Sequence, residues 1–326
     1  MAESSSRRRF PTRDVVVTAV KYLFALAVLA FGAIYIATQW GKVSAALSTT
    51  PPWIIVTALV LVLAALFASM LSWWVLWPAF GARLGLRVGA RVFFVSQLGK
   101  YVPGSVWPIA AQAQMTRRLK VSAASSVVLS LIAMLVSVAI GLAMGAVLGP
   151  ISRPRLLVDY WWLVIVGVLL LVLLAPSILT RCVHIALRVL RRPDASFRLS
   201  WGTIGASAAA QAANWILGGL QLWLLVIGVG GDPGSSLIPC LAAFPLAFSL
   251  GILLVPFPAG LGVREFVITL LLAQVIPAPA AVTAAVLSRL LYAISDFGSA
   301  GVSMIAARGL MRATGPSEVT AAKPAE

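Results

Sequence analysis

Long apolar segments separated by short polar connections dominate the 326-residue sequence. Six of these segments are long enough for a helix to cross a bilayer, which requires about 20 apolar residues. None alternates between apolar and polar residues over about ten positions, as a strand of an outer-membrane barrel does. The pattern predicts an all-α polytopic membrane protein with about six full transmembrane helices. The predicted spans are Val15–Thr38, Trp53–Trp77, Val121–Gly149, Tyr160–Thr180, Trp201–Val229 and Ala280–Arg308.

A further apolar segment, Val92–Ile109, contains helix-breaking residues near its centre: Gly99, Pro103, Gly104 and Pro108. Proline removes a backbone donor and clashes with the preceding turn of a helix. A segment of about 18 residues with such a break is poorly suited to a full crossing. Irregular backbone at membrane depth also needs protein or water to satisfy its polar groups. The segment therefore predicts a re-entrant hairpin.

A second broken segment, Leu254–Thr269, lies in one of the most apolar regions of the chain. It contains two prolines, two glycines and an adjacent pair of opposite charges: Pro256, Pro258, Gly260, Gly262, Arg264 and Glu265. Ionisable residues at membrane depth are costly and mark functional sites by default. Two interpretations follow, a second re-entrant hairpin and a short loop at the level of the headgroups.

Composition supports the membrane assignment, because 61% of the residues are hydrophobic and only 10% are charged. A net charge of +16 is typical of proteins that bind nucleic acid, but in this chain the basic residues cluster in short loops between the apolar segments. That distribution indicates membrane topology and contact with anionic headgroups. We therefore expect no nucleic-acid partner.

Placing the N-terminus in the cytoplasm puts nineteen basic residues inside and only Lys42, Arg153 and Arg155 in the outer loops. The excess of basic residues inside predicts that both termini are cytoplasmic, in a plasma or bacterial inner membrane. Residues 237–276 fit this count best as a hairpin entering from outside, since a full crossing would move the last basic cluster outside. The segment Arg181–Arg198 is basic and amphipathic, and we expect it to lie on the inner surface.

The two hairpins would enter from opposite sides, and a helix rich in small residues follows each. This arrangement predicts an inverted-topology repeat, in which broken helices meet near the midplane. We expect one transmembrane domain, 15–311, with halves of about 15–150 and 156–311. Residues 1–14 and 312–326 are expected to be disordered cytoplasmic ends. The N-termini of the half-helices would suit an anion such as phosphate.

Five charged residues fall inside the predicted membrane region: Lys100, Arg264, Glu265, Arg289 and Asp296. They predict either a substrate-binding site or a structural network in which arginines and carboxylates neutralise one another. Gln211, Asn214 and Gln221 are polar residues within the fifth span. Two distant cysteines and one histidine give neither a disulfide framework nor a metal-ligand cluster. We therefore expect no metal and no cofactor.

The two broken motifs, Gln97-Leu-Gly-Lys-Tyr-Val-Pro-Gly104 and Pro256-Phe-Pro-Ala-Gly-Leu-Gly-Val-Arg-Glu265, together with Arg289, resemble the lysylphosphatidylglycerol synthase transmembrane (flippase-like) family. The resemblance extends over about Val15 to Arg308. It departs from the family at Trp107-Pro108, where many members carry Gly-Glu. The chain resembles a stand-alone member, because no aminoacyl-transferase domain follows the last helix.

The resemblance implies lipid handling, and lipid translocation in some members. We predict a flippase, not an enzyme, that moves a phosphate-bearing lipid: an aminoacylated phospholipid, a glycolipid or a polyprenyl-phosphate-linked sugar. The alternatives are a membrane-embedded glycosyl or lipid transferase, and a non-transporting accessory subunit of an envelope-lipid enzyme. A homodimer, and a glycosyltransferase or lipid-synthesis partner, are compatible with these functions. The predicted substrate-binding residues are Gln97, Lys100, Pro103, Gly104, Pro258, Gly260, Gly262, Arg264, Glu265, Arg289 and Asp296.

Overall fold

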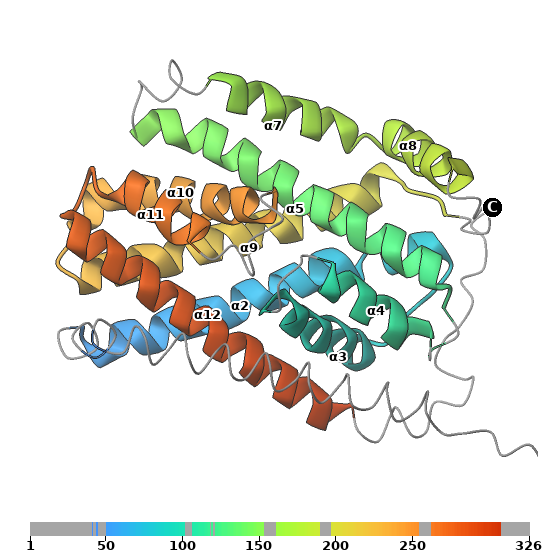
Figure 1. Cartoon of the computed structure of the whole chain (residues 1–326), viewed down its shortest axis with the longest axis horizontal. Coiled ribbons are helices and arrows are strands. Elements are labelled where there is room, and N and C mark those ends of the chain that lie inside the picture. Colours follow the sequence, from blue (N-terminus) through green and yellow to red (C-terminus); the bar gives the residue numbers. More distant parts are fainter. Residues whose placement is uncertain are drawn as a thin grey trace, which may run out of the picture.

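All regular elements in the described part of the chain are helices (Figure 1). The computed structural model describes residues 41, 44, 50–101, 106–117, 119, 121–152, 161–189, 197–253 and 262–307. The elements are α2 (Pro52–Trp74), η1 (Trp77–Phe80), α3 (Leu86–Gln97), η2 (Leu98–Tyr101), α4 (Trp107–Arg117), α5 (Ala123–Ser152), α7 (Trp161–Leu173), α8 (Pro176–Val189), α9 (Trp201–Gly228), α10 (Pro233–Leu253), α11 (Val263–Leu272) and α12 (Ala278–Ala306).

Five of the described helices, α2, α5, α9, α10 and α12, are long and apolar enough to cross a membrane. Four of them coincide with predicted spans, and the prediction of an all-α polytopic membrane protein is confirmed. The first predicted span, Val15–Thr38, lies outside the described residues, as do both predicted disordered ends. Local sequence signals mark where these helices begin. Ser200 caps α9 by accepting a hydrogen bond from the Thr203 N–H at 3.1 Å.

The predicted fourth span, Tyr160–Thr180, was wrong as one straight helix. It is divided between α7 and α8, whose axes differ in direction by 80°. Pro176 begins α8. Its ring disfavours helical backbone at Ala175, so the chain turns there. The helix α8 carries the first half of the predicted basic amphipathic segment, and its His184 ring stacks on Phe197 with centroids 5.0 Å apart.

Basic residues gather at one end of the helical bundle, which we call the basic end. It comprises α8, the first turn of α3 and the last turn of α4, which lie on the right of Figure 1. The segment η1 and the last turn of α12 carry no basic residue but adjoin this end. Two contacts join these elements. Arg91 Nη1 donates to the carbonyl of Ala307 at 3.4 Å, and the Arg198 N–H donates to the carbonyl of Ala79 at 2.9 Å. The basic loop residues that the structure describes therefore lie at one end, whereas the predicted outer-loop residues Lys42, Arg153 and Arg155 lie outside the described part of the chain.

The first hairpin consists of α3, η2 and α4, and it enters the bundle from the basic end (Figure 1). Its two arms approach closely at Gly99, where a Cβ atom would lie 2.9 Å from the backbone nitrogen of Pro108. Real Cβ atoms are essentially never so close to backbone, so this position requires glycine. The glycine and proline that break this segment in the sequence are therefore the residues that let its arms pack together.

The second hairpin consists of α10 and α11, and it enters from the opposite end (Figure 1). Gly251 and Ile252, near the end of α10, line the same cavity as Ser137 and Gln211, which lie near the middles of α5 and α9. The helix α10 therefore stops about halfway along its neighbours, although it is long enough to cross. Its start is capped by Asp232, whose Oδ2 accepts from the Ser235 N–H and hydroxyl, each at 2.8 Å. These hydrogen bonds hold the pKa of the Asp232 carboxyl below its usual range.

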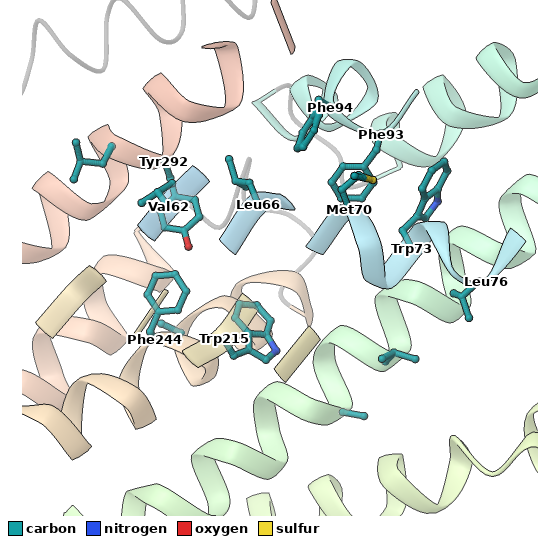
Figure 2. Close-up of a cluster of buried hydrophobic side chains, with 14 of the residues drawn as sticks. Val62, Leu66, Met70, Trp73, Leu76, Phe93, Phe94, Trp215, Phe244 and Tyr292 are labelled. Carbon is teal, nitrogen blue, oxygen red and sulfur yellow. The ribbon is translucent and has the colours of Figure 1, made fainter. Parts of the chain in front are cut away.

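A core of large side chains fixes both hairpins to the long helices (Figure 2). Trp73 of α2 lies against Phe93 of α3, with ring centroids 5.6 Å apart. Phe244 of α10 packs on Tyr292 of α12, with ring centroids 5.5 Å apart. Aromatic pairs of this kind contribute about 0.5–1.5 kcal/mol beyond the area that they bury. The hairpins are therefore held by packing on both sides of the central cavity.

Candidate functional site

The structure brings seven of the predicted site residues together near the middle of the bundle. They are Gln97, Lys100, Gly262, Arg264, Glu265, Arg289 and Asp296. The other four, Pro103, Gly104, Pro258 and Gly260, lie outside the described residues. The first hairpin, the second hairpin and α12 each supply charged side chains to this cluster. The site is therefore built between two halves of the chain that are far apart in sequence.

Asp296 of α12 binds two side chains of the first hairpin through one oxygen. Lys100 Nζ lies 2.6 Å from Asp296 Oδ2, and the Tyr101 hydroxyl donates to the same atom at 2.6 Å. Only 2% of the Asp296 side chain is exposed. A buried carboxylate needs such partners, because an unpaired buried charge costs several kcal/mol. Tyr101 was not predicted, and its place beside Lys100 in the motif was the only signal for it.

Glu265 joins the second hairpin to α12 and also caps α11. Its Oε1 pairs with Arg289 Nη1, and its Oε2 accepts a hydrogen bond from the Gly262 N–H at 2.9 Å. Gly262 has a φ of +80°, in the left-handed region that favours glycine. The prediction of a mutually neutralising network thus holds for Arg289 with Glu265, whereas Asp296 pairs with a lysine and not with an arginine.

Arg264 differs from the other cations of the site. Its guanidinium lies over the ring of Phe248, with Cζ 3.9 Å from the ring centroid. Its Nε is buried without a hydrogen-bond partner among the residues that the structure describes. Buried polar groups are nearly always hydrogen-bonded, and an orphaned one calls for an explanation such as a missing ligand.

A cavity of about 230 Å³ lies where the two hairpins meet. Lys100, Arg264 and Asp296 line it together with four amides and several hydroxyls. The uncharged polar residues include Gln97, Gln112, Ser130, Ser137, Gln211 and Asn214. Of these, the substrate-binding prediction included only Gln97, although polar residues in the apolar fifth span had signalled two more. A smaller adjoining cavity is lined by Lys100, Arg264 and Asp296, and by the Glu265–Arg289 pair.

The described charges of the site do not cancel. Three cations, Lys100, Arg264 and Arg289, face two carboxylates, Glu265 and Asp296. Each carboxylate is already in an ion pair, with Arg289 and with Lys100 respectively. The surplus positive charge is that of Arg264, which lines both cavities. A planar guanidinium matches phosphate and carboxylate groups in geometry, so the cavity can bind an anionic group.

These observations define the class of protein: an all-helical, multi-pass membrane protein in which two opposed hairpins meet at a polar, cationic cavity. Residues 19–297 match the lysylphosphatidylglycerol synthase TM region. Since this match covers most of the sequence, the chain belongs to that family, as the two broken motifs had indicated. A search of curated proteins found no match.

Proposed function

We propose that the protein is a lipid flippase that moves a phosphate-bearing lipid between membrane leaflets. The observation that carries this proposal is Arg264, a cation that lines the cavity and whose buried Nε has no hydrogen-bond partner among the described residues. A lipid phosphate would satisfy this group and use the surplus positive charge. The candidate substrates all bear a phosphate: they are aminoacylated phospholipids, phosphate-bearing glycolipids and polyprenyl-phosphate-linked sugars.

The position of the cavity supports transport. Transporters built on inverted repeats bind substrate near the membrane midplane, where broken helices meet, and open the site to each side in turn. Here the hairpins approach from opposite ends, and the cavity lies between them. The lipid chains would stay in the bilayer while the headgroup passes through the cavity.

A transferase is the alternative function. Such an enzyme needs a base to activate its acceptor, and a carboxylate is a frequent choice. Glu265 and Asp296, the carboxylates of the described site, are both held by cations. Both oxygens of Glu265 and the Oδ2 oxygen of Asp296 are occupied by these and neighbouring contacts, so few of their lone pairs are open to an acceptor's proton. This pairing supports a transporter, which needs only a cation for the phosphate.

The gathering of basic residues at one end of the bundle supports a location in a plasma or bacterial inner membrane, with both termini in the cytoplasm. Cytoplasmic loops carry an excess of lysine and arginine, and the basic end of the bundle would face that side. The anionic headgroups of the inner leaflet would attract it. A second copy of the chain, or an enzyme of lipid or glycan synthesis, is a compatible partner for a flippase in this position.

Leaflet-resolved lipid movement tests the proposal. Fluorescent phosphatidylglycerol is placed in vesicles with and without the purified protein, and a membrane-impermeant quencher reports the outer-leaflet fraction over time. A phosphate-free glucosyl diacylglycerol with the same labelled chains is the matched control. We expect the protein to accelerate exchange of the phosphate-bearing lipid only. Equal exchange of both lipids, or of neither, would contradict the proposal.

A further inference from the structure

We infer that the cavity selects lipids whose phosphate carries an uncharged, hydroxyl-bearing headgroup, such as a sugar or polyol, and rejects lipids with a cationic headgroup. This inference rests on the proposed function and narrows its substrate class. It follows from the hydrogen-bonding groups that the cavity leaves unused, from the charges that already line it, and from its aromatic walls.

Asn214 of α9 is a buried amide with unused hydrogen-bonding capacity. The residue is only 5% exposed and lines the cavity. Its amide has no hydrogen-bond partner within the described residues, and neither of its polar atoms is among the fully buried ones left without a partner, so the amide faces the open space of the cavity. Its carbonyl oxygen can accept and its NH₂ group can donate. A bound ligand that offers both donors and acceptors would use both groups.

Three other amides are partly or wholly unused. Gln97 forms no side-chain hydrogen bond with the part of the chain that is described. Gln211 donates from Nε2 to Ser137 Oγ at 3.0 Å, which leaves its carbonyl oxygen unused. Gln112 accepts from the Ser130 hydroxyl and has its NH₂ group to spare. The cavity therefore offers unused donors and unused acceptors side by side.

Hydroxyl groups match such a mixture, because each of them both donates and accepts. An ammonium group only donates, and it binds best to carboxylates. Both carboxylates of the described site already have cationic partners, Lys100 for Asp296 and Arg289 for Glu265. A cationic headgroup would also enter next to Lys100 and Arg264, and like charges repel strongly in a low-dielectric site.

The aromatic walls of the cavity offer apolar surface to a ring. A cation can bind over an aromatic ring, and Arg264 already occupies this position over Phe248. Trp73, Trp215 and Tyr292 also line the cavity, and such surfaces pack well against the C–H faces of a sugar or cyclitol ring. At about 230 Å³, the cavity is slightly smaller than the ~300–1,000 Å³ typical of small-molecule sites. It suits a headgroup of about one ring.

A competition between headgroups tests this inference. Vesicles containing the protein receive phosphatidylinositol or lysylphosphatidylglycerol with the same fluorescent chains, and phosphatidylglycerol serves as the reference lipid. We expect phosphatidylinositol to exchange at least about tenfold faster than the lysyl lipid, since the lysyl headgroup leaves amides of the cavity unpaired and meets like charges. Equal or faster exchange of the lysyl lipid would overturn the inference and leave the flippase intact. Exchange of none of the three would overturn the flippase itself.

Substitutions at Asn214 test the assignment to the cavity. Asn214→Leu removes the unused amide and should slow phosphatidylinositol exchange. Asn214→Asp adds an unpaired carboxylate and should raise the rate for the lysyl lipid relative to phosphatidylinositol. Gln114→Leu is the matched control, since it removes an exposed amide from α4, two residues beyond Gln112, and should change neither rate. A headgroup preference that is the same in both Asn214 variants as in the wild type would overturn the inference, and normal unfolding temperatures would show that the variants are folded.

Discussion

Lys100 of the first hairpin and Asp296 of α12 form an ion pair, with Nζ and Oδ2 2.6 Å apart, in the middle of the helical bundle. The two residues are almost two hundred positions apart in sequence. Their contact joins a hairpin that enters from the basic end to a helix that runs the whole length of the bundle. The pair also forms part of the wall shared by the two cavities, so it links the stability of the fold to the candidate site.

The first prediction concerns this ion pair. Asp296→Asn removes the carboxylate and leaves Lys100 as an uncompensated charge, which we expect to lower the free energy of unfolding by about 3–5 kcal/mol. Tyr101→Phe removes only one hydrogen bond to the same oxygen and should lower it by about 1.5–3 kcal/mol. Denaturant unfolding in detergent measures both. If Tyr101→Phe lowered the free energy of unfolding as much as Asp296→Asn, the ion pair with Lys100 would contribute nothing to stability.

The second prediction concerns the other ion pair, between Glu265 and Arg289. A single Glu265→Gln or Arg289→Gln change breaks this ion pair by removing one of its two charges and should lower the free energy of unfolding by about 3–5 kcal/mol. The double variant removes both charges, and the amide introduced at position 265 can still accept from the Gly262 N–H. We expect the double variant to be more stable than either single one, as in a strongly coupled double-mutant cycle. Additive losses would mean that the two side chains act independently.

The third prediction concerns the left-handed backbone at the start of α11. Gly262→Ala places a Cβ on a residue with a φ of +80°, and this should lower the free energy of unfolding by about 1–2 kcal/mol. Gly298 of α12 is the matched control, because it is helical and no atom lies within 4 Å of its Cβ position. Gly298→Ala should raise stability by about 0.5–1 kcal/mol. Identical shifts in unfolding temperature for the two variants would contradict the described hairpin start.

The fourth prediction concerns orientation. Cys182 is exposed on α8, at the basic end, whereas Cys240 is buried in α10. A membrane-impermeant maleimide should label Cys182 only after the cells are permeabilised, and Cys182→Ala should abolish that labelling. Labelling of Cys182 in intact cells would reverse the proposed topology.

Much of this arrangement could be predicted from the sequence, because apolar segments of membrane length and clustered basic loops act over short ranges of the chain. The helix breaks at Gly99 and at Gly262 predicted both hairpins, because such breaks are also local features of the sequence. The bend before Pro176 was missed, since a proline near the end of an apolar segment is compatible with a straight span as well.

Pairings across the bundle were harder to predict. The sequence placed Arg264, Arg289, Glu265 and Asp296 at membrane depth, but which charge meets which depends on the rotation of each helix and on the depth of the hairpins. Spacing within one segment does not determine these quantities. For this reason the sequence did not reveal that Asp296 pairs with a lysine from the other half of the chain and not with an arginine. The amides of the cavity wall come from three different helices. Gln97 was predicted from its motif, Gln211 and Asn214 were noted for their polarity in an apolar span, and Gln112 was not predicted.

The measurement that tests the account most directly is phosphatidylglycerol exchange by Arg264→Gln in reconstituted vesicles. This variant removes the surplus cation whose buried Nε has no described partner. We expect its unfolding temperature to match or exceed that of the wild type, since no ion pair of the described residues is lost. We expect exchange to fall by at least about tenfold, the effect of losing a charge-assisted hydrogen bond of about 1.5–3 kcal/mol, and Arg264→Lys to retain part of it. A folded Arg264→Gln variant that exchanges the lipid at the wild-type rate would contradict the account.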